Sequence, residues 1–476
     1  MPHINAIKGP AYVMSVLLLL LTVFLGGATR AGFLSDVLLQ FLSIPFLLAA
    51  LWMWADRLGA RTGAGMAQGL RPDLVLAFAM LAVGGLIALA QFVPIFGSAG
   101  TGALWRHIAS QGGTLSGAAT GTSSLDPAMS RAALAALLPA AALFLLVALL
   151  DLEQRMRLIG WIVAIGLGCL CLGVLQVLQG PTSALRFFRF TNFEDAVGFF
   201  ANRNHFAAQL YVTLPFVLVW FAFKCAGMFD NRKITAQKLQ WVAVGLGLVL
   251  LFLAGIALAR SRAGILLTFV AFAPMVLMAP TLLAVLMGNR PRVASVKGRA
   301  AVAGGALLLL IAGLGAERAV PRFEDSSLND LRTALVVTTS QAAWEALPFG
   351  SGLATFVPVY KVYEKAKDLL PPLVNRAHND WLEFALEAGL PGVLLMLLFV
   401  GWLVLRALPG WVGVRGLAPE ARLITCAASL AIGLLLIHSF LDYPLRTGAM
   451  LGYFALFCAL LTPVAAPAAR RATAFA

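Results

Sequence analysis

The chain has 476 residues, of which 61% are hydrophobic and 12% charged, and its formal net charge is +14. A soluble domain carries about 25% charged residues, so this composition excludes an ordinary soluble protein and is typical of a polytopic membrane protein. We expect membrane lipids around it and no nucleic-acid partner, because the basic residues gather on one side of the predicted spans.

Apolar runs long enough to cross a bilayer recur along the whole chain. We predict an all-α fold, a polytopic bundle of about twelve transmembrane helices. The ninth span is short, and a long hydrophilic loop, residues 316–390, separates it from the tenth. The predicted spans lie near residues 11–27, 37–55, 73–95, 131–150, 159–178, 205–223, 239–259, 264–287, 300–315, 390–408, 423–440 and 447–465.

The charges on the predicted loops favour one orientation in the membrane. With the N-terminus in the cytoplasm, the inside segments hold 19 of the 35 basic residues and six acidic residues, whereas the outside segments hold 16 and 15. This is the positive-inside pattern. We therefore expect both termini inside and the segments 96–130, 180–204 and 316–390 outside.

The sequence predicts no metal site and no cofactor. Its five cysteines lie in or beside predicted spans and form neither a CxxC pair nor a disulfide framework. It contains no HExxH, P-loop, GxSxG or dinucleotide fingerprint. The acidic pairs Glu194–Asp195 and Glu324–Asp325 leave a metal site open, although the chemistry considered below does not require one.

Several arginines lie on the outside, where the positive-inside rule disfavours them. The outside segments are too short for a core of their own, so we expect an active site where they rest on the helix bundle. Arginine binds phosphate oxygens through its planar fork of donors, and membrane-interface anchoring is the alternative. We favour an anion site for Arg262 and Arg332, anchoring for Arg186 and Arg189, and neither role over the other for Arg203.

The densest polar cluster surrounds His378, within Arg376-Ala377-His378-Asn379-Asp380. The residues that follow predict a short helix, capped by Asn379 or Asp380 and ending at Gly389, with Glu383 and Glu387 one turn apart. The positive end of a helix favours a neutral imidazole, which can act as a general base. A capping or packing role for His378 is the equal alternative.

Further along the chain, His438, Asp442 and Arg446 recur every four residues. This spacing predicts that His438 and Asp442 share a helix face, with Pro444 distorting its end. We favour a structural, hydrogen-bonded set at the membrane boundary for them. Earlier in the chain, residues 348–353 predict a turn and not a nucleotide-binding loop.

Five of these motifs occur in an order that is known from one family. They are FFANRNHFAAQL at 199–210, ARSRAG at 259–264, Arg332 before a tryptophan and a Pro-Phe-Gly-Ser-Gly turn, AHNDWLEFALEAGLPG at 377–392, and HSFLDYPLR at 438–446. Together they cover roughly residues 195–460. This region resembles the bacterial O-antigen ligase/polymerase superfamily, whereas the first half of the chain agrees only in being helical.

The resemblance implies an inverting, metal-independent glycosyltransferase of the bacterial inner membrane, with its active site and the helical loop 316–390 in the periplasm. The donor would be a glycan linked to undecaprenyl pyrophosphate. The acceptor would be lipid A-core for an O-antigen ligase, or another lipid-linked glycan for a polymerase of O-antigen or exopolysaccharide. A protein O-oligosaccharyltransferase and a transporter or flippase of the same lipid-linked glycans are the alternatives.

The resemblance also implies roles for individual residues. His378 would be catalytic and would deprotonate the acceptor hydroxyl, while Arg262 and Arg332, with Arg203, would bind the donor pyrophosphate. The expected supporting residues are Arg260, Arg376, Asn379, Asp380, His438 and Asp442.

We expect three regions along the chain. Residues 1–195 would be N-terminal transmembrane helices that form a lipid-facing scaffold. Residues 196–465 would be the catalytic membrane region, which includes the loop 316–390, and residues 466–476 would be a cytoplasmic tail.

Overall fold

The computed structural model describes most of the chain, and every regular element in the described part is a helix. The all-α prediction is confirmed for these residues. They are 9–30, 32–63, 72–93, 102–110, 122–231, 233–288, 326–364, 374–414 and 417–464.

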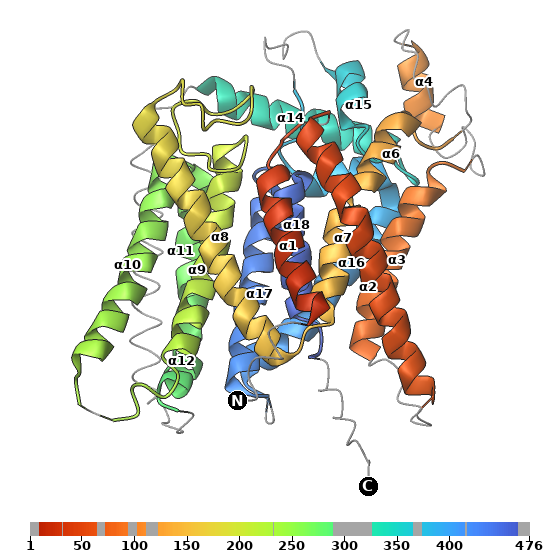
Figure 1. The fold of residues 1–476 in the computed structure, drawn as a ribbon. Coiled ribbons are helices and arrows are strands. Elements are labelled where there is room, and N and C mark those ends of the chain that lie inside the picture. The colour runs from red at the N-terminus through yellow and green to blue at the C-terminus, as the bar shows by residue number, and fades with distance from the viewer. Residues whose placement is uncertain are drawn as a thin grey trace.

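The helices follow one another along the chain as labelled in Figure 1. Their bounds are α1 Pro10–Leu25, α2 Leu34–Gly63, α3 Pro72–Ala90, α4 Gly102–Ser110, α6 Pro127–Ala136, α7 Leu138–Ala148, α8 Leu152–Gln179, α9 Arg203–Lys224, α10 Ala236–Leu258, α11 Arg262–Leu277, α12 Ala279–Leu286, α14 Ser326–Glu345, α15 Phe356–Tyr363, α16 Asp380–Val412, α17 Pro419–His438, the 3-10 helix η5 Pro444–Arg446, and α18 Gly448–Leu460.

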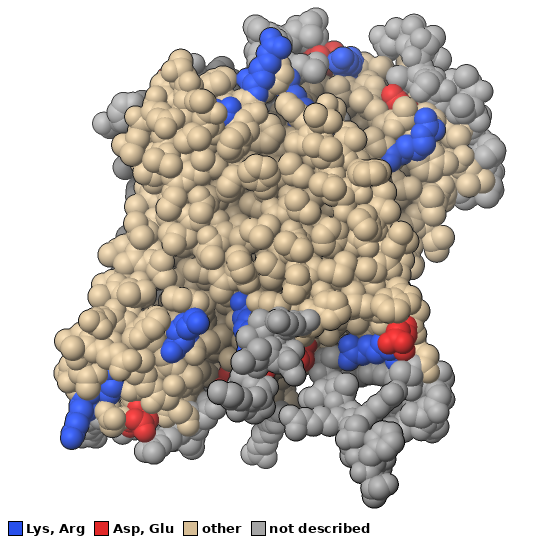
Figure 2. Space-filling view, viewed as in Figure 1, with Lys and Arg blue, Asp and Glu red and all other residues tan. Residues whose placement is uncertain are grey.

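Many of these helices are long and apolar enough to cross a membrane. In the described part of the chain there are seven such helices, or eight if α11 and α12, bent by 55°, count as one span, and three shorter apolar helices. Figure 2 shows an uncharged belt between two charged ends, as a bilayer requires. The chain is thus a multi-pass membrane protein. The predicted span 300–315 lies outside the described residues, so the number twelve stays a prediction.

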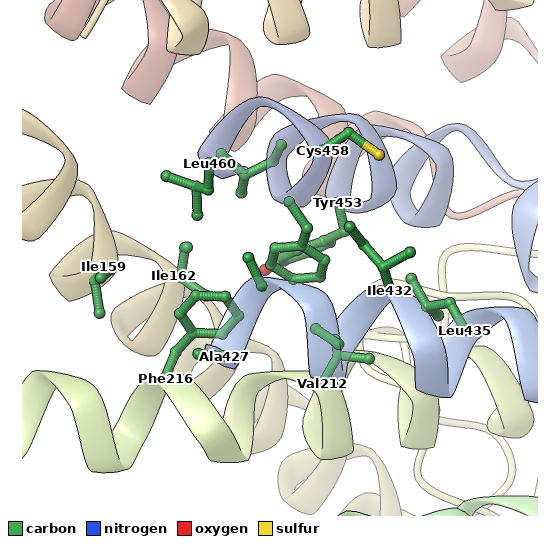
Figure 3. Close-up of a cluster of buried hydrophobic side chains, with 14 of the residues drawn as sticks. Ile159, Ile162, Val212, Phe216, Ala427, Ile432, Leu435, Tyr453, Cys458 and Leu460 are labelled. Carbon is green, nitrogen blue, oxygen red and sulfur yellow. The ribbon is translucent and has the colours of Figure 1, made fainter. Parts of the chain in front are cut away.

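The centre of the bundle is formed by α7, α8, α9, α17 and α18. Figure 3 shows part of this core, in which Phe216 of α9 lies among side chains of the neighbouring helices. Its ring stacks on Phe457 of α18 with a centroid distance of 5.0 Å. In lipid, close packing of this kind holds helices together, because lipid tails are as apolar as the side chains themselves. Helix α9, which carries part of the candidate site, is therefore firmly held.

The segments at the upper end of the bundle form a second hydrophobic cluster of their own. There α14 runs across the ends of the spanning helices, with α15 and α4 beside it (Figure 1). The expectation that the outside segments have no separate core was wrong, because short helices far apart in sequence pool their apolar side chains. The buried members are Leu104, Ile108, Leu125, Leu335, Ala342, Ala346, Phe356, Val359, Tyr360, Tyr363, Ala377 and Leu386.

Helix α16 is broken at Gly389, whose φ of 60° lies in the left-handed region. The turn at 348–352 docks on this break: the Leu390 N–H donates to the Pro348 carbonyl at 2.8 Å, and the Ser351 N–H donates to the Leu386 carbonyl at 2.9 Å. A Cβ atom on Gly389 would lie 2.4 Å from the Pro348 carbonyl oxygen, so only glycine fits. The predicted helix stop and the predicted turn are both confirmed.

Candidate active site

Three helix starts and one turn meet at the upper end of the bundle. Asn202 caps α9, Ser261 caps α11 and Asn379 caps α16, each by accepting a backbone N–H with its side-chain oxygen. The predicted capping role of Asn379 is confirmed. Side-chain hydrogen bonds join these starts to one another and to the turn that follows α17. Helix starts carry partial positive charge, so their convergence favours an anionic ligand.

His378 is paired with the carboxylate of Asp442. Its Nδ1 lies 2.9 Å from Asp442 Oδ1, and the imidazole is 32% exposed while the carboxylate is 1% exposed. The backbone of His378 has a φ of 51°, in the left-handed region. Because Nδ1 is used by the carboxylate, the second ring nitrogen, Nε2, is left for a substrate. This is the arrangement by which a carboxylate orients a histidine base.

Asp442 is held from its other side as well. The Asn204 side-chain amide donates to Asp442 Oδ2 at 2.7 Å, and the Ser261 hydroxyl donates to Asn204 Oδ1 at 2.8 Å. Burial alone would raise the pKa of Asp442, but its hydrogen bond to His378 and the nearby histidines lower that pKa well below its ordinary value. The carboxylate is therefore ionised at neutral pH.

The ring of Tyr443 packs against the imidazole. Tyr443 lies edge-on between His378, at a centroid distance of 4.9 Å, and His205, at 5.1 Å. Burial, followed by the negative charge of Asp442, raises the pKa of Tyr443 to about 12, so its hydroxyl stays neutral. His438 lies deeper, with its Nδ1 2.8 Å from the Tyr211 hydroxyl.

The predicted shared helix face of His438 and Asp442 was wrong. Helix α17 ends at His438, and Asp442 lies in the turn beyond it. The residue before a proline is disfavoured in helical conformation, so Pro444 pushes Tyr443 and its neighbours out of the helix. The turn points Asp442 towards His378, whereas His438 stays in the bundle.

A buried cluster of charges lies on the other side of His378, along the first turns of α16. Arg446 contacts three carboxylates of that helix: Asp380 at 3.3 Å, Glu383 at 3.5 Å and Glu387 at 2.6 Å. Arg376 pairs with Glu383 at 2.9 Å. Burial by itself would lower the pKa of Arg446, but the three carboxylates raise it above its ordinary value. We call these five residues the carboxylate–arginine cluster.

Glu383 connects this cluster to residues 376–379, which we call the histidine loop. Its Oε2 accepts the Ala377 N–H at 2.9 Å, directly before His378. The Asp380 N–H donates to the Ser439 carbonyl at 2.8 Å, and the Asp380 side chain accepts the Ser439 hydroxyl at 2.9 Å. The residues on both sides of His378 are therefore fixed, which supports its uncommon backbone conformation.

Two of the three predicted anion-binding arginines, Arg203 and Arg262, occupy the same helix starts. Arg203 is the first residue of α9 and contacts Asp195 at 2.9 Å, while Arg262 is the first residue of α11. Arg260 is 64% exposed and faces Asp195 at 3.4 Å. Arg332 lies on α14, but its side chain is outside the described residues. The structure thus brings Arg203 and Arg260 to one carboxylate, with Arg262 at the adjacent helix start.

Arg186 holds the outside loop together, while the membrane-interface anchoring that we favoured for it stays a prediction. Its guanidinium donates to the carbonyl oxygens of Asn192 at 3.0 Å and Asp195 at 2.9 Å. It thereby closes the outside loop before α9 and keeps Asp195 beside the arginines.

Two participants were missed by the sequence analysis. Asn204 and Ser261 join the helix starts to the His378–Asp442 pair, yet neither was assigned a role. Each is the immediate neighbour of a predicted arginine, Arg203 or Arg262. A polar residue beside a predicted ligand-binding residue at a helix start was the available signal.

In the part of the chain that the structure describes, no group of three or more His, Cys, Asp or Glu side chains is placed to hold a metal ion. The prediction of no metal and no cofactor nevertheless stays a prediction.

Comparison with known proteins points to one family. A family model described as O-antigen ligase matches residues 234–397, a range that contains Arg262, Arg332 and His378. Asn204 and Asp442, which complete the hydrogen-bonded chain, lie outside the match. No curated protein matches the chain. This match agrees with the motifs, and it supports a likeness of this region of the chain to the O-antigen ligase/polymerase superfamily.

Proposed function

We propose that the protein is an inverting membrane glycosyltransferase that moves a glycan from undecaprenyl pyrophosphate to a hydroxyl acceptor. The match of residues 234–397 to the O-antigen ligase family supports a glycosyltransferase-like function in the assembly of O-antigen or lipopolysaccharide. The donor, the acceptor and the mechanism are our proposal. The observation that carries it is the His378–Asp442 pair, which lies at helix starts that bear arginines.

In this mechanism His378 Nε2 takes the proton of the acceptor hydroxyl, while Asp442 stabilises the imidazolium that forms. The acceptor oxygen attacks the anomeric carbon, and the bond from that carbon to the pyrophosphate oxygen breaks. Attack from the face opposite the leaving group inverts the anomeric centre. The electron pair of the broken bond stays on undecaprenyl pyrophosphate, which leaves as the anion.

The leaving anion needs stabilisation that is present before the bond breaks. We assign this role to Arg262 and Arg332, with Arg203 beside them, and to the positive ends of α9 and α11. Preplaced donors of this kind stabilise developing charge without reorganisation. Arginine suits the task because its charge does not depend on pH and its donors match phosphate oxygens. Such a site needs no metal ion.

The location of the site supports a periplasmic reaction. The helix starts of the site lie at the end of the bundle opposite the start of α1 and the end of α18 (Figure 1). With both termini in the cytoplasm of an inner-membrane protein, that end faces the periplasm. We propose residues 1–195 as the scaffold, 196–465 as the catalytic region and 466–476 as a cytoplasmic tail.

The deciding experiment is a transfer assay with purified protein. It receives a polyprenyl-pyrophosphate oligosaccharide, either with a lipid A-core acceptor or with more donor alone, and His378→Ala serves as the inactive control. A single-step product on lipid A-core identifies a ligase, and a ladder from donor alone identifies a polymerase. Absence of product with both substrates, for wild type and His378→Ala alike, contradicts the proposal and favours transport of the lipid-linked glycan.

A further inference from the structure

We propose that Asn204 is a positioning residue, which fixes the carboxylate of Asp442 and through it sets the orientation and tautomer of His378. Ser261 in turn fixes the Asn204 amide. The inference deepens the proposed function, because it rests on His378 acting as the base. It is carried by three consecutive hydrogen bonds of 2.8, 2.7 and 2.9 Å that connect Ser261, Asn204, Asp442 and His378.

The chain of hydrogen bonds has one allowed direction. The Ser261 oxygen accepts the Gly264 N–H at 3.1 Å as a helix cap, so its single hydrogen is available for Asn204 Oδ1. With Oδ1 occupied as an acceptor, the Asn204 NH2 group faces Asp442. The direction of this amide is thus determined by its partners.

The donor and acceptor roles are also fixed for the hydrogen bond between Asp442 and His378. Asp442 is ionised and can only accept, so its Oδ2 takes the Asn204 amide hydrogen and its Oδ1 takes a hydrogen from His378 Nδ1. That leaves the lone pair of the neutral imidazole on Nε2, the nitrogen that the substrate needs. Asn204 therefore holds the carboxylate in the position from which it selects the productive tautomer.

Asp442 needs an external anchor because of where it lies. It belongs to the turn between α17 and η5, where its N–H still donates to the His438 carbonyl at 2.9 Å but the helix does not continue past it. Asn204 lies in the first turn of α9, where the following residues from His205 to Val217 are all buried. The rigid helix thus holds the carboxylate of the turn.

The same two helix starts carry the proposed donor arginines. Asn204 follows Arg203, and Ser261 precedes Arg262. A displacement of either helix start therefore changes the grip on the donor and the orientation of the base together.

Other titratable groups also face the pair and are unchanged in the variants below. His205 of α9 and His438 of α17 act on Asp442 electrostatically. Tyr443 contacts the His378 ring, and Arg376 lies on the histidine loop. Because these groups stay in place, a shift in pH dependence on changing Asn204 reports the loss of its own contact.

The kinetic test compares Asn204→Ala and Asn204→Asp with wild type. We expect kcat to fall by about 10- to 100-fold, the range for losing a hydrogen bond to a charged group, with KM for the donor little changed. In Asn204→Asp a second carboxylate faces Asp442 and favours the protonated imidazole, so the acid limb of kcat/KM moves to higher pH. If Asn204 has only a structural role, its replacement lowers kcat/KM at every pH and leaves the pH of the acid limb unchanged. Gln209→Leu is the matched control. It removes a buried side-chain amide from α9, the helix that carries Asn204, and this amide donates to the Tyr453 hydroxyl of α18.

Ser261 is tested against a second helix cap. Ser261→Ala removes both the cap and the contact to Asn204, whereas Ser261→Thr keeps a hydroxyl and should restore the wild-type profile. Thr235→Ala removes a comparable cap at the start of α10, the end of that helix that lies away from Ser261. We expect a lower kcat in Ser261→Ala but not in Thr235→Ala.

A spectroscopic readout separates this inference from the proposed function. ¹⁵N NMR of protein labelled at its five histidines reports the tautomer of His378, whose signal is identified by its absence in His378→Ala. We expect a hydrogen-bonded Nδ1–H in wild type that is weakened or lost in Asn204→Ala, whether or not the preparation transfers glycan. An unchanged His378 signal in Asn204→Ala overturns the inference. An inactive wild type with the expected signals contradicts the proposed function alone.

Discussion

Two polar networks flank His378, and they differ in how completely they are closed. On one side, Ser261, Asn204 and Asp442 lead through single hydrogen bonds to an imidazole that is 32% exposed. On the other, the carboxylate–arginine cluster is enclosed, and the carboxylates of Glu383 and Glu387 are fully buried. The first network ends in a group that can accept a proton from outside, whereas the second has no reactive end.

This difference indicates that the first network serves the proposed reaction and the second stabilises the fold. A buried ion pair is costly to form and more costly to break, so it fixes geometry without taking part in a reaction. An oriented histidine at the edge of the protein costs little to expose and can change its protonation state. We therefore expect changes in the first network to alter the rate of transfer, and changes in the second to alter folding.

The largest expected effect on rate comes from Asp442→Asn. The amide cannot stabilise an imidazolium and can hold the wrong tautomer, so we expect a loss in kcat of about 10³- to 10⁴-fold, as when the carboxylate of a serine-protease triad is changed. The measurement is single-turnover transfer at saturating donor. Since the pKa of Asp442 lies well below its ordinary value, the acid limb of the wild-type profile does not come from this carboxylate. Near-normal turnover by the variant would remove the basis for the pair.

Arg446→Met should act on the fold instead. It leaves three buried carboxylates without their common partner, so we expect a loss of about 3–5 kcal/mol in stability. Thermal unfolding in detergent checks this. The control is Arg157→Met, which breaks the exposed pair of Arg157 with Glu153 and should cost no more than about 1 kcal/mol. Equal effects of the two changes would contradict the distinction drawn between the networks.

Arg262→Ala tests whether this arginine stabilises the pyrophosphate of the donor. Removing one preplaced donor for a developing anion costs about 10²- to 10³-fold in kcat in other enzymes, and we expect a similar loss here. The melting temperature should stay near that of wild type, because Arg262 lies at the partly exposed start of α11. Wild-type turnover by this variant would exclude Arg262 from the pyrophosphate site.

Tyr443→Phe should have the smallest effect at neutral pH, a loss of about 1 kcal/mol in stability for one hydroxyl group. Its distinguishing effect is on the pH dependence of stability at alkaline pH. Because the pKa of Tyr443 is raised to about 12, the unfolded chain loses this proton near pH 10 while the folded chain keeps it, so stability falls between these values. The phenylalanine variant lacks this contribution. Its free energy of unfolding, measured as a function of pH, should therefore decline less steeply above pH 10 than that of wild type.

Much of the fold was predictable because the signals are local. Apolar runs mark the spans, and Asn379 and Gly389 mark the start and the break of the first part of α16. The spacing of Glu383 and Glu387 correctly puts them on one helix face, since both contact Arg446. Such features depend on residues within a few turns of one another.

The pairings within the site were not predictable, because they join residues far apart in sequence. His378 and Asp442 are 64 residues apart, and Asn204 and Asp442 are 238 apart. The four-residue spacing of His438 and Asp442 suggested a helix that Pro444 prevents. The second hydrophobic cluster was missed for a related reason, since its members come from helices far apart in sequence.

The position of Asp442 near the end of the chain has a consequence for biosynthesis. A chain inserted into the membrane from its N-terminus delivers Arg203, Asn204 and Arg262 first, then His378, and Asp442 only with the last two helices. Until the turn after α17 is in place, a nascent chain has its donor arginines and its histidine but no carboxylate to orient the base. On the proposed mechanism, base catalysis therefore depends on the completion of insertion, and we expect a chain truncated before this turn to leave lipid-linked sugars untouched.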